Sequence, residues 1–441
     1  MKLMQLMKGG AALINAFERR LVIQASSIVH ATIIESCQSY DWFCSEAAQL
    51  IDTFAVVAMV YCSLASLTHI VTSAMLVLRY RRSSESPALA KQHLGSLRTS
   101  LPPVSVIRPV CGVDYYDGLT LRSTFALGYP DYEILFCASR ADDAAVPLVK
   151  ALIAEHPTVR ARLLIGDDLP TANPKLNNIV KGWQAAQSQW IVIADSNVLM
   201  PREYISELMD AWDAQTGLVC SPPVGSHPHG FAAEIECAFL NGYQARWQCA
   251  ADAIGFGFAQ GKSMLWRRDI LDEAGGIIAL GSEIAEDAAA TKIVRARGLN
   301  VRLVDKPFEQ PLGPRQINAV WNRQVRWARL RRATFAPFYV PELLTGSSLP
   351  IAAGVLSAQT FDIDPAMMCA VLVAVWYGAE TIVTRAAGWH MTMFSPFAWA
   401  ARDLLLPVLW AQGWTGNTFT WRGNAMTVAA GKSGLSTATA R

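Results

Sequence analysis

The chain has 441 residues, of which 52% are hydrophobic and only 17% are charged. This composition is more apolar than that of an ordinary soluble domain, so part of the chain is expected to contact lipid. The formal net charge of +2 gives no reason to expect nucleic acid or a strongly acidic molecule as a partner.

Residues 1–52 are expected to form an N-terminal extension. Its first 24 residues place lysines and arginines among apolar residues at roughly helical spacing, which is typical of an amphipathic helix at a membrane interface. An upstream extension or a misassigned start of translation explains the same pattern. A signal peptide fits less well, because the segment carries internal charges and has no clean apolar core.

Residues 53–80 are predicted to form a transmembrane helix. The stretch 53–78 has no charged side chain apart from His69, and it is long enough to cross a bilayer core of about 30 Å. A buried core helix is the alternative. Three arginines follow, Arg79, Arg81 and Arg82. Because positive charge marks the cytoplasmic side, the region after them is expected to face the cytoplasm.

A polar linker is predicted at 81–103, and a folded domain at 104–341. In this domain β-rich runs alternate with helical patterns, which indicates an α/β fold with a mostly parallel sheet. Strands are expected at 104–110, 133–138, 161–165, 190–194, 218–220 and 301–304. Helices are expected at 144–155, 177–186, 204–213 and 288–297.

The C-terminal region 342–422 is apolar again and predicts two or three membrane-embedded helices. The candidate segments are 343–360, 365–383 and 397–414. Glu380 interrupts the second of them, and the adjacent pair Arg402-Asp403 interrupts the third. Such charges are costly at membrane depth unless they are paired or face a cavity. The small, polar residues 423–441 are expected to form an unstructured tail.

Three acidic segments are the most informative motifs of the chain. The first contains Asp142 and Asp143, the second Asp195, and the third Glu286 and Asp287. The first two follow predicted strands, and carboxylates at the ends of parallel strands lie where open α/β sheets bind ligands. A basic motif, Arg323-Gln-Val-Arg326-Trp327, comes after them.

This order of motifs resembles the inverting, nucleotide-sugar-dependent glycosyltransferases of the GT-A fold. The likeness narrows to the ceramide glucosyltransferase family, over roughly 103–341, when further segments are added. They are 173–178, which contains Lys175, then 230–233, 272–276 and 284–287. Animal members have a His-Pro pair where this chain has Gln244-Ala245. The chain therefore resembles a bacterial-type branch of the family.

The resemblance implies a Rossmann-like nucleotide-sugar-binding domain flanked by transmembrane helices. It implies transfer of a hexose, with glucose as the first choice, from a UDP-sugar to the primary hydroxyl of ceramide. It also implies an integral protein of the bacterial inner membrane. The alternatives are transfer to another lipid such as a hopanoid, a processive polysaccharide synthase, and a membrane scaffold or transporter without activity.

The resemblance also implies roles for individual residues. Asp287 is expected to act as the general base that inversion requires, with Glu286 supporting it. Asp195 is expected to bind Mg²⁺ or Mn²⁺, which prefer oxygen ligands, although Asn197 leaves only one strong ligand in the motif. The residues expected to bind the nucleotide sugar are Asp142, Asp143, Lys175, Asp195, Arg323, Arg326 and Trp327.

Each of these residue types also has a structural interpretation. An aspartate after a strand often caps a helix, and a basic helix face is often only solvated. The two arginines lie three residues apart and hence on one helix face, and guanidinium groups match phosphate oxygens. Trp327 either offers a flat surface to a sugar or lipid, or simply packs.

Overall fold

The computed structural model describes residues 41–85, 101–166, 169–421 and 424–428. The part of the N-terminal extension that was predicted to be amphipathic, most of the linker and most of the tail lie outside these residues. The described chain divides into two compact units. One comprises the residues up to 63 together with 352–369, and the other comprises 64–351 and the residues from 370 onwards.

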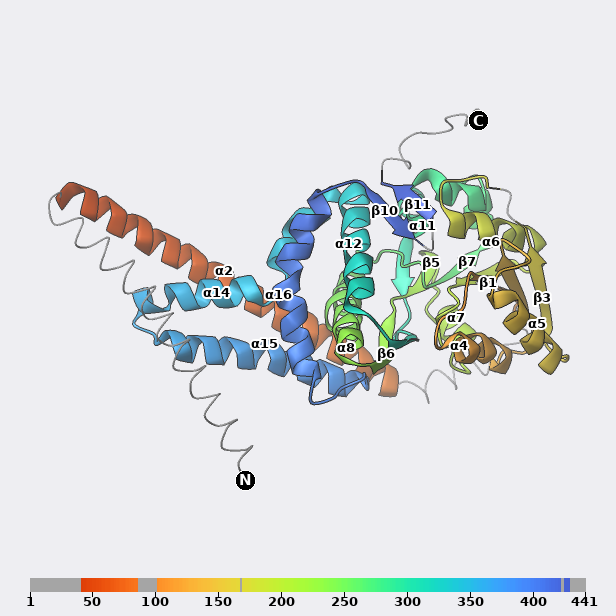
Figure 1. Ribbon diagram of the computed structural model, residues 1–441, viewed down its shortest axis with the longest axis horizontal. Coiled ribbons are helices and arrows are strands. Elements are labelled where there is room, and N and C mark those ends of the chain that lie inside the picture. The colour runs from red at the N-terminus through yellow and green to blue at the C-terminus, as the bar shows by residue number, and fades with distance from the viewer. Residues whose placement is uncertain (1–40, 86–100, 167–168, 422–423, 429–441) are drawn as a thin grey trace, which may run out of the picture. The chain divides into compact units, whose positions relative to one another are not determined.

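A seven-stranded sheet forms the centre of the larger unit (Figure 1). Its strands, in spatial order, are β3 (Arg160–Ile165), β2 (Tyr132–Ala138), β1 (Val104–Val110), β4 (Trp190–Ala194), β7 (Ser263–Arg267), β5 (Thr216–Ser221) and β8 (Asn300–Leu303). Every pair is parallel except the two pairs that β7 makes, with β4 and β5. The predicted α/β class and the mostly parallel sheet are confirmed, but β7 was not predicted.

Helices cover both faces of this sheet, which explains why its central strands are apolar at nearly every position. One face packs against α6 (Pro174–Ala185) and α11 (Glu286–Ala296). The other face packs against α5 (Ala145–Glu155) and α7 (Tyr204–Asp210). These four helices agree with the sequence-based prediction to within a few residues at each end.

Two smaller sheets were not predicted. A parallel pair consists of β6 (Val224–His229) and β9 (Glu309–Pro314). An antiparallel pair consists of β10 (Thr418–Trp421) and β11 (Asn424–Thr427). Because β11 lies in the segment 423–441, the expectation of an unstructured tail was wrong for these four residues.

Two described helices contain stretches that are long and apolar enough to cross a membrane. They are Gln49–Ser83 within α2 (Asp41–Glu85) and α15 (Pro365–Ala387). The third C-terminal candidate, α16 (Ser395–Trp414), instead packs its buried side chains against α8 (Phe231–Ala238) and α12 (Ile317–Thr334) (Figure 1). A short helix, α14 (Ser348–Ser357), precedes α15.

The charges that interrupt the C-terminal helices are paired with one another. Arg402 donates to Glu380 at 2.5 Å and to Asp403 at 2.9 Å, and all three side chains are buried. A buried charge is tolerated when a partner and hydrogen bonds compensate it. Pairing therefore explains how α15 and α16 accommodate these residues.

Candidate active site

A cavity of about 1580 Å³ lies at the carboxyl ends of β1, β2 and β4. Its wall includes the ends of these strands, the segment before β7, the N-terminal parts of α6 and α11, and one face of α12. All nine predicted site residues line it: Asp142, Asp143, Lys175, Asp195, Glu286, Asp287, Arg323, Arg326 and Trp327. The fold thus brings together motifs that are up to 185 residues apart in the sequence (327 − 142).

Asp143 holds the loop after β1 against the loop after β2. Its carboxylate accepts hydrogen bonds from the backbone N–H of Gly112, at 2.9 and 3.1 Å, and from that of Ala145, at 2.8 Å. The neighbouring Asp142 is exposed and pairs with Arg140. Asp143 therefore does part of what a helix-capping residue does, while it also lines the cavity.

Asp195 lies between two lysines. Its Oδ1 is 2.6 Å from Lys175 Nζ, and its Oδ2 is 2.9 Å from Lys262 Nζ. Both contacts hold the pKa of the Asp195 carboxyl well below its usual range, against the opposing effect of burial. Lys262 also donates to the side-chain oxygen of Asn197, at 3.2 Å.

Lys175 connects the second acidic motif to the third. Its ammonium group contacts Asp195, Glu286 Oε1 at 2.6 Å and the backbone oxygen of Gly261 at 2.7 Å. The other carboxylate oxygen of Glu286 accepts from Asn173 Nδ2 at 2.8 Å. Glu286 is therefore fully engaged by this network, and it fixes the N-terminus of α11 relative to α6.

Asp287 follows Glu286 in the first turn of α11, and within the described residues no lysine or arginine forms an ion pair with its carboxylate. Oδ1 accepts from the backbone N–H of Ala288 at 2.8 Å, and Oδ2 from that of Gly261 at 3.3 Å. Burial, and secondarily the negative charge of Glu286, raise the pKa of Asp287 to about 6. A carboxylate with this pKa is a stronger base than an ordinary aspartate and is still ionised at neutral pH.

The basic motif lies on α12, where one residue of it is tied to a buried carboxylate. Arg323 pairs with Glu236 of α8, whose side chain is fully buried and also lies 3.4 Å from Arg315. Trp327 packs against a small apolar cluster of Cys237, Leu240 and Leu312. Arg323, Arg326 and Trp327 all line the cavity, so the face of α12 that carries the basic motif forms part of its wall.

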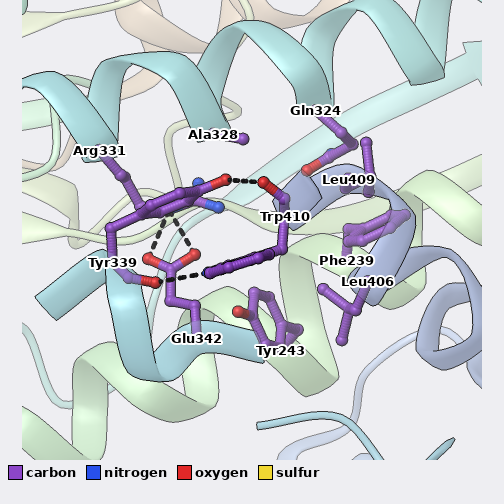
Figure 2. A pocket seen from close by; sticks show the side chains of 10 residues that line it. All are labelled: Phe239, Tyr243, Gln324, Ala328, Arg331, Tyr339, Glu342, Leu406, Leu409 and Trp410. Carbon is purple, nitrogen blue, oxygen red and sulfur yellow. Dashed lines mark hydrogen bonds and ion pairs between the residues drawn. The ribbon is translucent and has the colours of Figure 1, made fainter. Parts of the chain in front are cut away.

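A second group of contacts fixes the C-terminal half of α12 (Figure 2). Arg331 donates to both carboxylate oxygens of Glu342, at 2.8 and 3.0 Å. Tyr339 and Trp410 exchange two hydrogen bonds, in which each side chain donates to the other's backbone oxygen, at 2.8 and 3.1 Å. Tyr339 belongs to α13 (Ala336–Tyr339), the short helix that follows α12, and Trp410 belongs to α16. These bonds therefore tie the segment after α12 to a C-terminal helix.

Apolar side chains line another part of the cavity wall. Several come from the segment that follows α12, among them Phe335, Phe338 and Pro341. Phe338 is 67% exposed, so this part of the wall leaves apolar surface open to contact with a ligand or with lipid. A cavity with carboxylates and arginines on one part of its wall and apolar groups on another suits a substrate that has both characters.

The residues around Asp195 do not fit a divalent cation in the arrangement that the structure shows. Mg²⁺ and Mn²⁺ need several oxygen ligands, but ammonium groups contact both carboxylate oxygens of Asp195. Within the described residues, no group of three or more His, Cys, Asp or Glu side chains is arranged to hold a metal ion. We therefore assign no step of a reaction to a metal.

Lys262 is the site residue that sequence reasoning missed. It directly precedes β7, and its ammonium group reaches Asp195 because β7 pairs with β4. The short strand carries no alternating pattern, so the sequence gives no local sign that this lysine faces the second acidic motif. Glu236, which holds Arg323, was missed for a similar reason, since no motif contains it.

Comparison with known proteins gives a family match and several relatives. The sequence pattern of Glycosyl transferase family 21 matches residues 54–434. Ceramide glucosyltransferase 3 of Caenorhabditis elegans is 27% identical over 342 residues, which are 76% of this chain and 74% of the relative. Ceramide glucosyltransferase of Komagataella phaffii is 28% identical over 288 residues, which are 52% of this chain and 56% of the relative.

Two of the solved structures that match this chain do so with low TM-scores. Mannosyltransferase PcManGT of Pyrobaculum calidifontis, in complex with GDP-Man and Mn²⁺, matches with a TM-score of 0.46 and 17% identity, over 80% of this chain and 99% of that one. TarS of S. aureus, residues 1–349 in complex with UDP, matches with a TM-score of 0.34 and 11% identity, over 74% of this chain and 96% of that one.

Proposed function

The chain belongs to glycosyl transferase family 21, and from this membership we propose that it transfers a hexose from a UDP-sugar to the primary hydroxyl of a ceramide-like membrane lipid. The observation that carries the proposal is the convergence of all nine predicted site residues on one cavity. Glucose is the proposed hexose and ceramide the proposed acceptor, because both named relatives are ceramide glucosyltransferases.

Asp287 acts as the general base in this proposal. It accepts the proton of the acceptor hydroxyl while the hydroxyl oxygen attacks the anomeric carbon of the sugar. The bond from that carbon to UDP breaks on the opposite side, and the electron pair leaves with the diphosphate oxygen. A single displacement of this kind inverts the anomeric centre and needs no carboxylate nucleophile.

The remaining motif residues hold the donor. Asp142 and Asp143 are proposed to accept hydrogen bonds from the uracil and ribose, near the loop that Asp143 fastens. Arg323 and Arg326 are proposed to bind the diphosphate, since guanidinium groups match phosphate oxygens. Lys175 at the second acidic motif and the indole of Trp327 complete the predicted donor site. The divalent cation expected at Asp195 is not part of this proposal, because lysines contact both oxygens of that carboxylate.

A lipid acceptor fits the composition of the wall. Apolar side chains after α12 suit the acyl or sphingoid chains, while the polar part admits only the headgroup hydroxyl. Two described helices are long and apolar enough to cross a membrane. We propose that the catalytic region faces the cytoplasm of a bacterial inner membrane, with Arg81 and Arg82 exposed at the end of α2.

Reconstitution tests the proposed reaction directly. The full-length protein is placed in lipid nanodiscs that contain ceramide, supplied with UDP-glucose, and the lipid extract is analysed by mass spectrometry and proton NMR. We expect a monohexosylceramide with a β-anomeric linkage. Transfer only to a polyhydroxylated hopanoid in parallel nanodiscs, or formation of a soluble polymer, would overturn the ceramide assignment.

A further inference from the structure

The pairing of β4 with β7 places a lysine at the position where the sequence predicts a metal ion. Ala194 is the register partner of Ser263, and the backbone N–H of Asp195 donates to the carbonyl of Lys262 at 3.0 Å. Asp195 and Lys262 are therefore direct cross-strand neighbours, whose Cβ atoms lie about 4.5–5.5 Å apart in such pairs. The backbone ladder, and not a mobile side chain alone, brings the ammonium group to the carboxylate.

We propose that the ammonium group of Lys262, and not a divalent cation, stabilises the diphosphate that leaves from the donor. The inference rests on the proposed glycosyl transfer and adds to it the group that compensates the leaving charge. When the bond between the anomeric carbon and UDP breaks, negative charge grows on the diphosphate oxygen. A preorganised cation at that oxygen lowers the barrier because it needs no reorganisation during the reaction.

Lys175 and Lys262 differ in how many of their ammonium protons are already bound by protein acceptors. An ammonium group has three donors. Lys175 directs its three protons to Asp195, Glu286 and the carbonyl of Gly261. It therefore connects the second acidic motif to the third. Lys262 directs two of its protons to Asp195 and Asn197. Lys262 lines the cavity, and its third proton is the one available to a phosphate oxygen.

The charges of the motif also favour an ammonium group over a metal ion. Only Asp195 contributes a negative charge, because position 197 is Asn. Asn197 offers a neutral oxygen, which suits an ammonium donor at 3.2 Å. A divalent cation at Asp195 would stand beside two ammonium groups that already contact both oxygens of this carboxylate, one of which also pairs with Glu286. Its repulsion by Lys175 and Lys262 opposes binding.

The test compares metal dependence and donor binding in full-length protein in nanodiscs. Hexose transfer is measured in excess EDTA and then with Mn²⁺ added, and UDP binding is measured by calorimetry in EDTA. Wild type is expected to keep its rate in EDTA within about threefold. Lys262→Met keeps the length of the side chain but removes the charge, and is expected to lose about 10²-fold in rate and to bind UDP more weakly.

Two further variants separate charge from folding. Lys262→Arg restores a cation and is expected to recover part of the rate, whereas Lys150→Met, at an exposed position of α5, is expected to match wild type. The double variant Lys262→Met/Asn197→Asp replaces the ammonium group by a second carboxylate. It is expected to be inactive in EDTA and to regain activity with Mn²⁺.

Wild-type activity that disappears in EDTA and returns with Mn²⁺ would overturn the inference, as would full activity of Lys262→Met. These outcomes are distinct from failure of the proposed function. If wild type transfers sugar to no lipid but binds UDP in EDTA in a way that depends on Lys262, the acceptor assignment fails and the inference about Lys262 stands.

Discussion

The contacts around Asp287 suit its predicted role as the general base. The ammonium group of Lys175 binds Asp195 and Glu286, while the contacts of Asp287 are backbone N–H groups. Burial and the charge of Glu286 then raise the pKa of Asp287 to about 6. A residue that is neutralised by a lysine would be a weak base, so this division of partners suits proton transfer.

The raised pKa of Asp287 gives a pH dependence. Below about 6 the carboxyl is protonated and accepts no further proton, so kcat/KM is expected to fall tenfold per pH unit as the pH decreases through that value. Glu286→Gln removes the neighbouring negative charge, lowers the pKa of Asp287 and is expected to move this acid limb to lower pH. A pH–rate profile of both proteins checks the shift, and an unmoved limb in the variant would contradict it.

Asp287→Asn is expected to abolish transfer while UDP still binds. The amide keeps the shape of the side chain but accepts no proton at neutral pH, and loss of a general base costs about 10²- to 10⁴-fold in rate. Turnover and calorimetric UDP binding are measured on the same preparation. Glu273→Gln, at an exposed position, is the control. Turnover of Asp287→Asn within tenfold of wild type would remove this residue from the role of base.

At the residue scale the sequence predicted the motifs better than their partners. All nine predicted residues line the cavity, and each of them was recognised from a short local motif. Lys262 and Glu236 were missed, since their contacts depend on which strands and helices become neighbours. Asp195 likewise carried a metal prediction that its two lysine contacts do not suit.

The elements that position the site differ in how readily their sequences predict them. The buried parallel strand β4 is a continuous apolar run, and β1 is mostly apolar apart from Ser105 and Arg108, so the predicted bounds of both strands agree with the structure. The antiparallel β7 begins with Ser263 and directly follows Lys262, and neither period nor a turn motif marks it. The short pairs β6–β9 and β10–β11 were missed for the same reason, because their pairing is decided by tertiary contacts.

The close packing of α6 on the sheet gives a prediction at the scale of an element. A Cβ at Gly182 would stand 2.7 Å from Cys137 Sγ and 2.8 Å from Ile107 Cγ2. Gly182→Ala is therefore expected to push α6 outward and destabilise the fold by about 1–3 kcal/mol. Since α6 carries Lys175 in its first turn, the rate of transfer is expected to fall as well.

Gly118→Ala is the matched control for this change. It makes the same substitution in a helix, α4 (Asp117–Ser123), but nothing lies within 4 Å of the added Cβ. Alanine is favoured over glycine within helices by roughly 0.5–1 kcal/mol, so this variant is expected to be neutral or slightly more stable. The midpoints of thermal unfolding of the two variants are compared. Equal midpoints would show that the space between α6 and the sheet accommodates a methyl group at position 182.

At the scale of the whole molecule, the end of α2 is fastened to the catalytic region. Arg79 donates to Asp252 at 2.7 Å and to the backbone oxygens of Leu303 and Val304 at 2.7 and 2.9 Å. The sequence marked Arg79 only as one of three positive charges at the end of a span. Its structural role was not predictable, because its partners are more than 170 residues away in the chain.

Arg79→Met is accordingly expected to differ from Arg82→Met, although each removes one positive charge. Arg79→Met leaves Asp252, a buried carboxylate, without its cation, and a broken buried pair of this kind lowers the unfolding midpoint by about 5–10 °C. Arg82 is exposed, so Arg82→Met is expected to unfold like wild type. Thermal unfolding in nanodiscs measures both, and equal loss in the two variants would contradict the docking role.

Expression in cells shows whether this family 21 glycosyltransferase places a hexose on a ceramide-like lipid. The full-length chain and its Asp287→Asn variant are expressed in a ceramide-containing bacterium that makes no glycosylceramide, and the total lipid extracts are compared by mass spectrometry. We expect a new monohexosylceramide with the wild-type chain and none with the variant. A new sugar on any other lipid, or identical lipid profiles from the two strains, would contradict it.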